Sequence, residues 1–276
     1  MVEVTGPGGV VMGMSSSVGA AGPPPPPPPL PAEPTLWATT SVSVGDHDVS
    51  GLVVTLRAGA RLSGRIVFEG DADKPTPEQV QQTLISVSAV TTSASVASVA
   101  KRVESDGAFA TNGYPPGKYL VSAVQPPSAG GKWRFKSVTQ GGRIVSDEGL
   151  DLQGGDVAGL VITFTDRLGE INGTANSERG SPDQTGSVVL LPADSTAWKE
   201  GVINTRRIRS TRLSSTGAFS FTELPPGAYF VAAIADDLPD NWQLAATLDA
   251  ITRVATRVVV ADGAKVSQSL TSRPIR

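Results

Sequence analysis

The side chains best suited to acid–base or nucleophilic chemistry are nearly missing from this chain. Its 276 residues include one histidine, His47, and no cysteine. A zinc hydrolase needs histidine ligands together with a carboxylate, and a serine triad needs a histidine base beside an activated serine. His47 follows Gly45-Asp46 in a turn sequence, and no G-x-S-x-G elbow occurs. The sequence therefore predicts a non-enzymatic protein with no cofactor.

Two groups of carboxylates are the remaining candidates for holding a cation. They are Asp71 with Asp73, and Asp236 with Asp237 and Asp240. Calcium takes about six to eight oxygen ligands, commonly from a tight loop with the spacing D-x-[DN]-x-[DN]-G. Neither group has that spacing, so we expect solvated loops and no metal site.

A glycan contact is the binding chemistry that the aromatic residues suggest most readily. Sugar rings stack on exposed tryptophan, and nearby polar groups orient their hydroxyls. Trp198 lies in the polar segment ADSTAWKE, where Asp194 and Lys199 supply such groups. The competing interpretation is that Trp198 covers the core of its own domain.

A basic strand follows this segment. Alternation places Arg207 and Arg209 on one face, and Arg206 and Arg212 on the other. An anionic ligand on Arg207 and Arg209 is one interpretation. A solvated edge protected by charge is the more common use of such a pattern.

The elements that must position these side chains form a duplicated unit. Ser215–Ile234 alternates apolar and polar residues on both sides of Pro225-Pro226-Gly227, as a half-buried hairpin does. Ser105–Val124 repeats it 110 residues earlier, with ten of twenty aligned positions identical. The spacing predicts two domains.

A boundary strand accompanies the repeat. The pattern of Asp48–Leu56 returns at Asp156–Phe164 and more weakly at Lys265–Leu270. Each unit then has a strand containing a glycine, Gly64 or Gly173, which indicates a bulge or a close backbone approach. Only Leu244–Ala255 has helical periodicity. Trp133 and Trp242 each precede the boundary pattern by the same interval, which predicts one structural role in two copies.

Both units resemble carboxypeptidase regulatory-like domains, the transthyretin-like or prealbumin-like modules of bacterial exported proteins such as acidobacterial multi-repeat proteins. The resemblance rests on the strand Gly64-Arg65-Ile66, on Asp106-Gly107-Ala108-Phe109, and on Pro115-Pro116-Gly117-Lys118-Tyr119, with its second copy at Pro225–Tyr229. It implies an all-β chain of two tandem seven-stranded antiparallel Ig-like sandwiches. Starch-binding sandwiches share this architecture, so by analogy the resemblance also suggests carbohydrate binding.

We predict four segments. Residues 1–36 form a disordered Pro-rich segment with seven consecutive prolines, either a stiff spacer or a ligand for aromatic grooves. Residues 37–47 form the remnant strand of a preceding repeat. Residues 48–155 form sandwich 1, and residues 156–276 form sandwich 2.

The function predicted from these features is a structural or interaction module of a secreted, periplasmic or cell-envelope protein. Its partner would be an envelope protein or a polysaccharide, and the alternative function is carbohydrate binding. A net charge of −3 argues against nucleic acid, and no apolar run reaches the roughly 18 residues of a membrane span. The N-terminus shows no signal peptide, so an exported module would have an incomplete beginning here.

Overall fold

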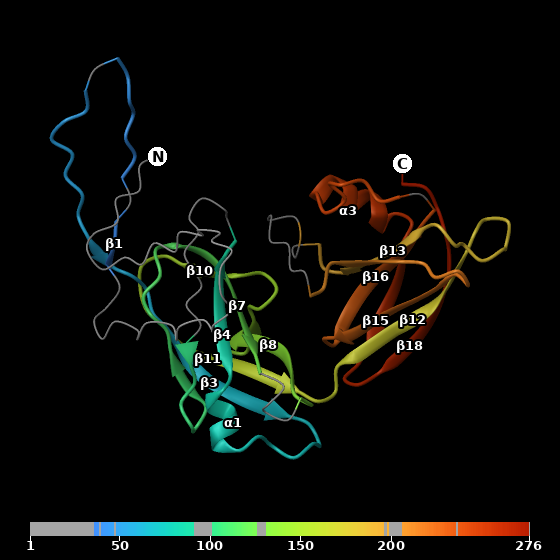
Figure 1. Cartoon of the computed structure of the whole chain (residues 1–276), viewed down its shortest axis with the longest axis horizontal. Coiled ribbons are helices and arrows are strands. Elements are labelled where there is room, and N and C mark those ends of the chain that lie inside the picture. Colours follow the sequence, from blue (N-terminus) through green and yellow to red (C-terminus); the bar gives the residue numbers. More distant parts are fainter. Residues whose placement is uncertain are drawn as a thin grey trace, which may run out of the picture.

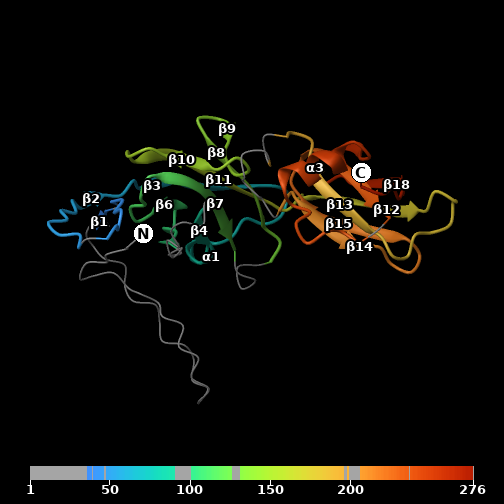
Figure 2. The same cartoon turned by 90° about the horizontal axis from the view of Figure 1, so that it is seen from above.

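The structure is a computed structural model, and it describes the chain in eight stretches: 36–38, 40–46, 48–90, 101–125, 131–195, 198, 206–235 and 237–275. Within these stretches the chain forms two β-sandwiches arranged one after the other along the long axis of the molecule (Figures 1 and 2). The prediction of two tandem β-sandwiches is confirmed. Residues 1–35 and His47 lie outside the described residues.

Sandwich 1 packs a four-stranded sheet of order β10-β7-β4-β5 on a five-stranded sheet of order β6-β3-β11-β8-β9. Its strands are β3 (Leu62–Glu69), β4 (Leu84–Ala89), β5 (Lys101–Arg102), β6 (Ala108–Ala110), β7 (Gly117–Val124), β8 (Arg134–Gln140), β9 (Arg143–Ile144), β10 (Leu150–Leu152) and β11 (Val157–Thr165). Helix α1 (Pro77–Gln81) begins at a capping box of Thr76 and Gln79. A two-stranded ribbon, β1 (Leu36–Trp37) with β2 (Arg57–Ala58), precedes the sandwich.

Sandwich 2 packs a three-stranded sheet of order β15-β12-β18 on a four-stranded sheet of order β14-β13-β16-β17. Its strands are β12 (Gly169–Asn176), β13 (Ser187–Pro192), β14 (Arg209–Arg212), β15 (Ala218–Leu224), β16 (Gly227–Ile234), β17 (Thr256–Val260) and β18 (Lys265–Thr271). Helix α3 (Ala245–Thr252) is the one predicted from the periodicity of Leu244–Ala255. In the part of the chain described here, sandwich 2 thus has the seven strands expected, and sandwich 1 has nine.

The boundary strand closes each unit, and this corrects the predicted division of the chain. β11 pairs in parallel with β3 and antiparallel with β8, so it completes sandwich 1, although the prediction placed it at the start of sandwich 2. β18 pairs in parallel with β12 in the same way. The sandwiches therefore are not wholly antiparallel. Alternation of residue types indicates a strand but does not identify its neighbours, which explains the misplacement.

The earliest copy of the boundary pattern forms no strand. Residues 48–56 belong to none of the sheets found in the described stretches, and Leu52, Val53 and Leu56 are exposed. The predicted strand at Leu52–Leu56 is therefore wrong for this structure. Of the strand predicted at Trp37–Val44, only Trp37 lies in a strand among the described residues, at the end of β1.

Gly64 and Gly173 mark close approaches of two backbones, as predicted. A Cβ atom on Gly64 would lie 1.9 Å from the Leu160 carbonyl oxygen, and one on Gly173 would lie 1.8 Å from the Gln268 carbonyl oxygen. Any side chain at either position would separate the parallel pair. These two glycines let the first and last strands of each unit pair directly.

The duplicated hairpin supplies the centre of both cores. Phe109 and Phe219 are 4% and 5% exposed, at equivalent places in the two sandwiches. The Tyr119 hydroxyl donates to the Pro115 carbonyl at 3.0 Å, and the Tyr229 hydroxyl donates to the Pro225 carbonyl at 2.6 Å. The repeated P-P-G-x-Y sequence is thus a corner tied by its own tyrosine. Burial raises the pKa of Tyr229 to about 12.

Candidate functional site

Trp198 is buried in the structure, with 3% of its surface exposed. It packs in a second apolar cluster on the outer face of the β13–β16 pair, where Val189, Ala232 and Leu248 also lie. Helix α3 supplies Leu248 to this cluster, which the local sequence did not reveal. The structure therefore corrects the placement of Trp198 as an exposed stacking surface and favours its alternative interpretation as a lid on its own sandwich.

The other predicted ligand-contact residues are Asp194, Lys199, Arg207 and Arg209. Asp194 is exposed, and Lys199 lies outside the described residues. The Arg209 guanidinium donates to the Thr222 carbonyl at 2.7 Å. Arg207 forms an ion pair with a residue of sandwich 1, described below. Arg207 and Arg209 thus have contacts within the protein, and the role of all four residues in ligand binding stays a prediction.

The residues that the structure does bring together lie at the junction of the two sandwiches. β11 ends at Thr165 and β12 begins at Gly169, so only three residues, 166–168, connect the two domains. The short spacing between the boundary strand and the next strand was the one sequence signal for this junction. A linker of this length restricts the relative motion of two packed domains.

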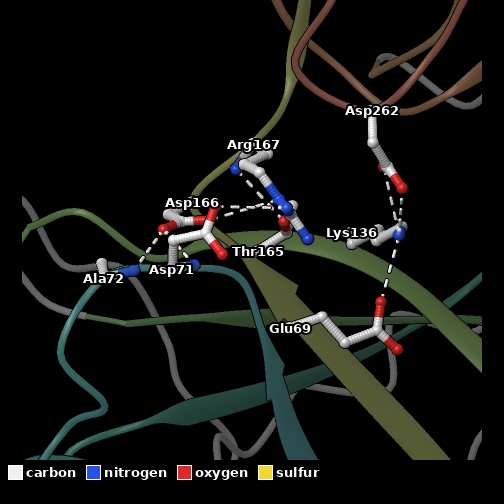
Figure 3. Close-up of polar contacts among 8 residues, drawn as sticks. All are labelled: Glu69, Asp71, Ala72, Lys136, Thr165, Asp166, Arg167 and Asp262. Carbon is white, nitrogen blue, oxygen red and sulfur yellow. Dashed lines mark hydrogen bonds and ion pairs between the residues drawn. The ribbon is translucent and has the colours of Figure 1, made fainter.

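Asp166 fixes the start of the linker to sandwich 1 (Figure 3). Its Oδ2 atom accepts hydrogen bonds from the backbone nitrogens of Asp71 and Ala72, at 3.0 and 2.7 Å. A Cβ atom on Gly70 would lie 1.9 Å from the carboxylate, so the glycine leaves room for it. The hydrogen bond from Ala72 is the main cause that lowers the pKa of Asp166. The next linker residue, Arg167, lies 3.3 Å from the Asp71 carboxylate.

Lys136 joins the two sandwiches directly. Its Nζ atom lies 3.1 Å from Glu69 of sandwich 1 and 3.1 Å from Asp262 of sandwich 2 (Figure 3). Partial burial by itself would lower the pKa of Lys136. The hydrogen bonds to both carboxylates outweigh that effect and hold the pKa above its usual value. The ammonium therefore stays charged and bridges the domains.

The predicted basic strand provides a second set of contacts across the junction. Arg207 Nε lies 2.8 Å from Asp147 Oδ2, and both side chains are largely buried. Arg206 donates to the Phe135 carbonyl, and its guanidinium lies 4.4 Å from the Phe135 ring centroid. Burial raises the pKa of Asp147, while Arg207 opposes that shift. The predicted strand is found only at Arg209–Arg212, so Arg206 and Arg207 lie in the turn before it, and no local sequence pattern identifies their partners.

A third contact borders an open cavity between the sandwiches. Arg134 Nε lies 2.6 Å from Glu223, which adopts a left-handed backbone with φ of 58°. The cavity, of about 650 Å³, is lined by apolar and cationic groups that include Trp133, Phe135 and Arg206. Gln125 also lines it, and both polar atoms of its side chain are buried without a hydrogen-bond partner among the described residues.

Trp133 and Trp242 do not share one role, contrary to the prediction from their spacing. Trp133 is 3% exposed, contacts Phe68 edge-on, and donates from Nε1 to the Asp73 carbonyl at 3.2 Å. Trp242 packs instead against the outer cluster beneath α3. Both are structural, on different surfaces of their sandwiches.

The described residues contain no group of three His, Asp or Glu side chains that could hold a metal ion. Asp237 instead pairs with Arg212 at 2.9 Å. Nor does any helix in those stretches have the length and apolar character needed to cross a bilayer. The absence of enzymatic activity stays a prediction.

No protein-family model and no curated protein matches the chain. Among solved structures, the chain is similar to the Bacillus anthracis TIE protein at 11% identity and a TM-score of 0.28, over 79% of this chain and 37% of that one. It is similar to GBS52, the minor pilin of Streptococcus agalactiae, at 13% identity and 0.33, over 79% and 97% of the two chains. A streptococcal ancillary pilin gives 13% identity and 0.32, over 87% and 71%. Membership of the carboxypeptidase regulatory-like family stays a prediction.

Proposed function

We propose that the chain is a stiff, non-enzymatic spacer module of a secreted, periplasmic or cell-envelope protein. The observation that carries this proposal is the junction, where a three-residue linker is reinforced by polar contacts across both domains. The module would hold its neighbours at a fixed separation. An envelope protein or a polysaccharide would be the partner of such a spacer.

The energetics favour stiffness from many contacts together. An exposed ion pair such as Arg134–Glu223 contributes only ~0–1 kcal/mol. The pairs Lys136–Asp262 and Arg207–Asp147 lie at separate points of the same interface, so a hinge motion would have to break them together. The linker offers no slack to compensate, because Asp166 is anchored on Asp71 and Ala72.

Distance measurements between spin labels test this proposal. The chain has no native cysteine, so labels on Ser88→Cys in sandwich 1 and Ser220→Cys in sandwich 2 report a single pair. The expected result is one narrow distance distribution, which broadens in Lys136→Ala. The matched control is Arg212→Ala, which breaks a surface pair within sandwich 2 and should leave the distribution unchanged. A broad distribution in the parent chain would contradict the spacer function.

Carbohydrate binding is the second candidate, and one observation favours it. The buried amide of Gln125, which has no hydrogen-bond partner in the described part of the chain, lines the junction cavity beside Trp133 and Phe135. The cavity thus combines an apolar wall with a polar donor and acceptor. Calorimetric titration with plant and bacterial oligosaccharides is the test, with Gln125→Leu as the variant. Heat of binding that disappears in this variant supports the candidate, and the absence of binding in the parent chain rejects it.

A further inference from the structure

β18 leaves one edge of its sheet without a neighbour. In sandwich 1 the equivalent strand β11 lies between β3 and β8, and β9 continues the sheet beyond β8. In sandwich 2 the sheet of order β15-β12-β18 ends at β18 among the described residues. The difference arises because the segment after Trp242 forms α3, whereas the segment after Trp133 forms β8.

The free edge of β18 has the geometry that an added strand requires. The Gln268 carbonyl faces Gly173 of β12, and backbone groups alternate along a strand, so those of Ser267 and Ser269 face away from the sheet. Both serines are exposed. The Gln268 side chain donates to the Ser269 carbonyl at 3.1 Å, a local contact that an incoming strand would replace. Unpaired edges of this kind accept strands from other chains.

The chain itself contains a strand-forming segment without a sheet. In residues 49–56 Val49, Leu52 and Leu56 are about half exposed, at 48%, 50% and 57%, and Val53 is 83% exposed. Leu52, Val54 and Leu56 occupy the positions that Leu160, Ile162 and Phe164 take in β11, where all three are fully buried. The segment is rich in β-branched residues, and its alternation fits a sheet with one buried face.

The two features lie at opposite ends of the molecule. Figure 1 shows the loop that contains residues 49–56 reaching outward beyond β1, far from β18 in sandwich 2. A single copy therefore does not bring them together. Contact between the ends of two copies is heterologous, so it leaves a free segment and a free edge for the next copy.

We propose that residues 49–56 of one copy add to the free edge of β18 in a second copy, antiparallel as β8 is to β11. Leu52, Val54 and Leu56 then face the core side of the sheet together with Val266 and Leu270. Repetition gives head-to-tail filaments of spacer modules. This inference deepens the proposed spacer function and rests on it, because a filament of fixed shape needs a stiff junction.

Cysteine crosslinking between two populations tests the contact in the full chain. One population has Thr55→Cys and the other Ser269→Cys, both at exposed positions expected on the solvent face of the added strand. Under mild oxidation we expect a disulfide-linked pair. The control is Ser220→Cys on β15, the opposite edge of the same sheet. Equal crosslinking to Ser220→Cys, or none to Ser269→Cys, would overturn the proposal.

The oligomeric state gives an independent test. Sedimentation of the full chain should show species that grow with concentration, and the double variant Leu52→Asp/Val54→Asp should sediment as a monomer. The matched control Val53→Asp places the same charge on the other face and should still assemble. None of these residues packs in either core, so the variants should fold normally. A parent chain that stays monomeric, with narrow distances between its spin labels, would overturn the assembly and leave the spacer function intact.

Discussion

The two sandwiches share one sequence pattern up to the tryptophan and differ in the segment that follows it. Both contain the corner with the buried tyrosine and the parallel pair of first and last strands. After the tryptophan, sandwich 1 adds β8 and β9 to its five-stranded sheet, while sandwich 2 places α3 over the outer face of the opposite sheet. The shared residues determine the inner core. The residues that differ determine which outer surface is covered and which edge stays open.

The equivalent strands β13 and β4 differ in how many of their residues are buried. All six residues of β13 are buried, because the inner core lies on one face and the cluster beneath α3 lies on the other. The equivalent strand β4 alternates between buried and more exposed residues, with Ile85 and Val87 buried. Sandwich 2 is therefore organised in three layers around β13, and sandwich 1 in two.

The largest effect should come from the side chains that the sandwiches share. Phe109→Ala should destabilise sandwich 1, and Phe219→Ala sandwich 2, each by about 3–5 kcal/mol, because a large aromatic is removed from a packed core. Amide hydrogen exchange resolved by residue would measure each sandwich separately. An unchanged exchange pattern in sandwich 2 of Phe219→Ala would show that the repeat does not define the core.

A somewhat smaller loss of stability is expected in sandwich 2 alone. Leu248→Ala in α3 removes a fully buried side chain and should cost sandwich 2 about 2–4 kcal/mol, with no loss in sandwich 1. Leu244→Ala, at an exposed position one turn earlier, is the control and should change stability by less than about 0.5 kcal/mol. Denaturant titration monitored by tryptophan fluorescence would measure both. Equal losses of stability in the two variants would show that the cluster beneath α3 does not stabilise sandwich 2.

The tied corners should contribute modestly and equally. Tyr119→Phe and Tyr229→Phe each leave a proline carbonyl without its partner, at a cost of about 0.5–1.5 kcal/mol. The pKa of Tyr229 is raised from 10.0 to about 12, so the unfolded chain loses this proton first as the pH rises. The stability that depends on the protonated hydroxyl is complete below pH 10 and falls between pH 10 and about 12. The stability of Tyr229→Phe should not show this fall between pH 10 and about 12. The same pH dependence of stability in Tyr229→Phe and in the parent chain would show that Tyr229 does not cause the fall.

The smallest effect on stability should come from the junction. Lys136→Met should cost about 0–1 kcal/mol, less at high salt, since the carboxylates that it contacts are about half exposed. The substitution should change the relative orientation of the sandwiches more than it changes the stability of either core. Thermal unfolding at low and high salt would measure the loss of stability. A loss of several kcal/mol would show that the two sandwiches fold as one unit.

The sequence was most informative where local pattern and repetition agree. The hairpin, the close approaches at Gly64 and Gly173, and α3 all follow from residue type and spacing. Alternation could not show that β11 pairs with β3 across some 90 intervening residues, so the domain boundary was placed too early. The polar sequence around Trp198 left open whether it is an exposed contact or a lid on its own sandwich, whereas its cluster in space belongs to β13, β16 and α3. Lys136 pairs with Asp262, and Arg207 pairs with Asp147, each in the other sandwich, and no local pattern reveals these contacts.

The rotational diffusion of the parent chain, measured by ¹⁵N relaxation on both sandwiches, tests the stiff junction most directly. If the linker and its polar contacts hold the domains together, the amides of β3 and β12 should report one diffusion tensor and one overall correlation time. Two shorter correlation times, each of the size expected for one sandwich alone, would contradict the central claim that the two domains form a single stiff spacer.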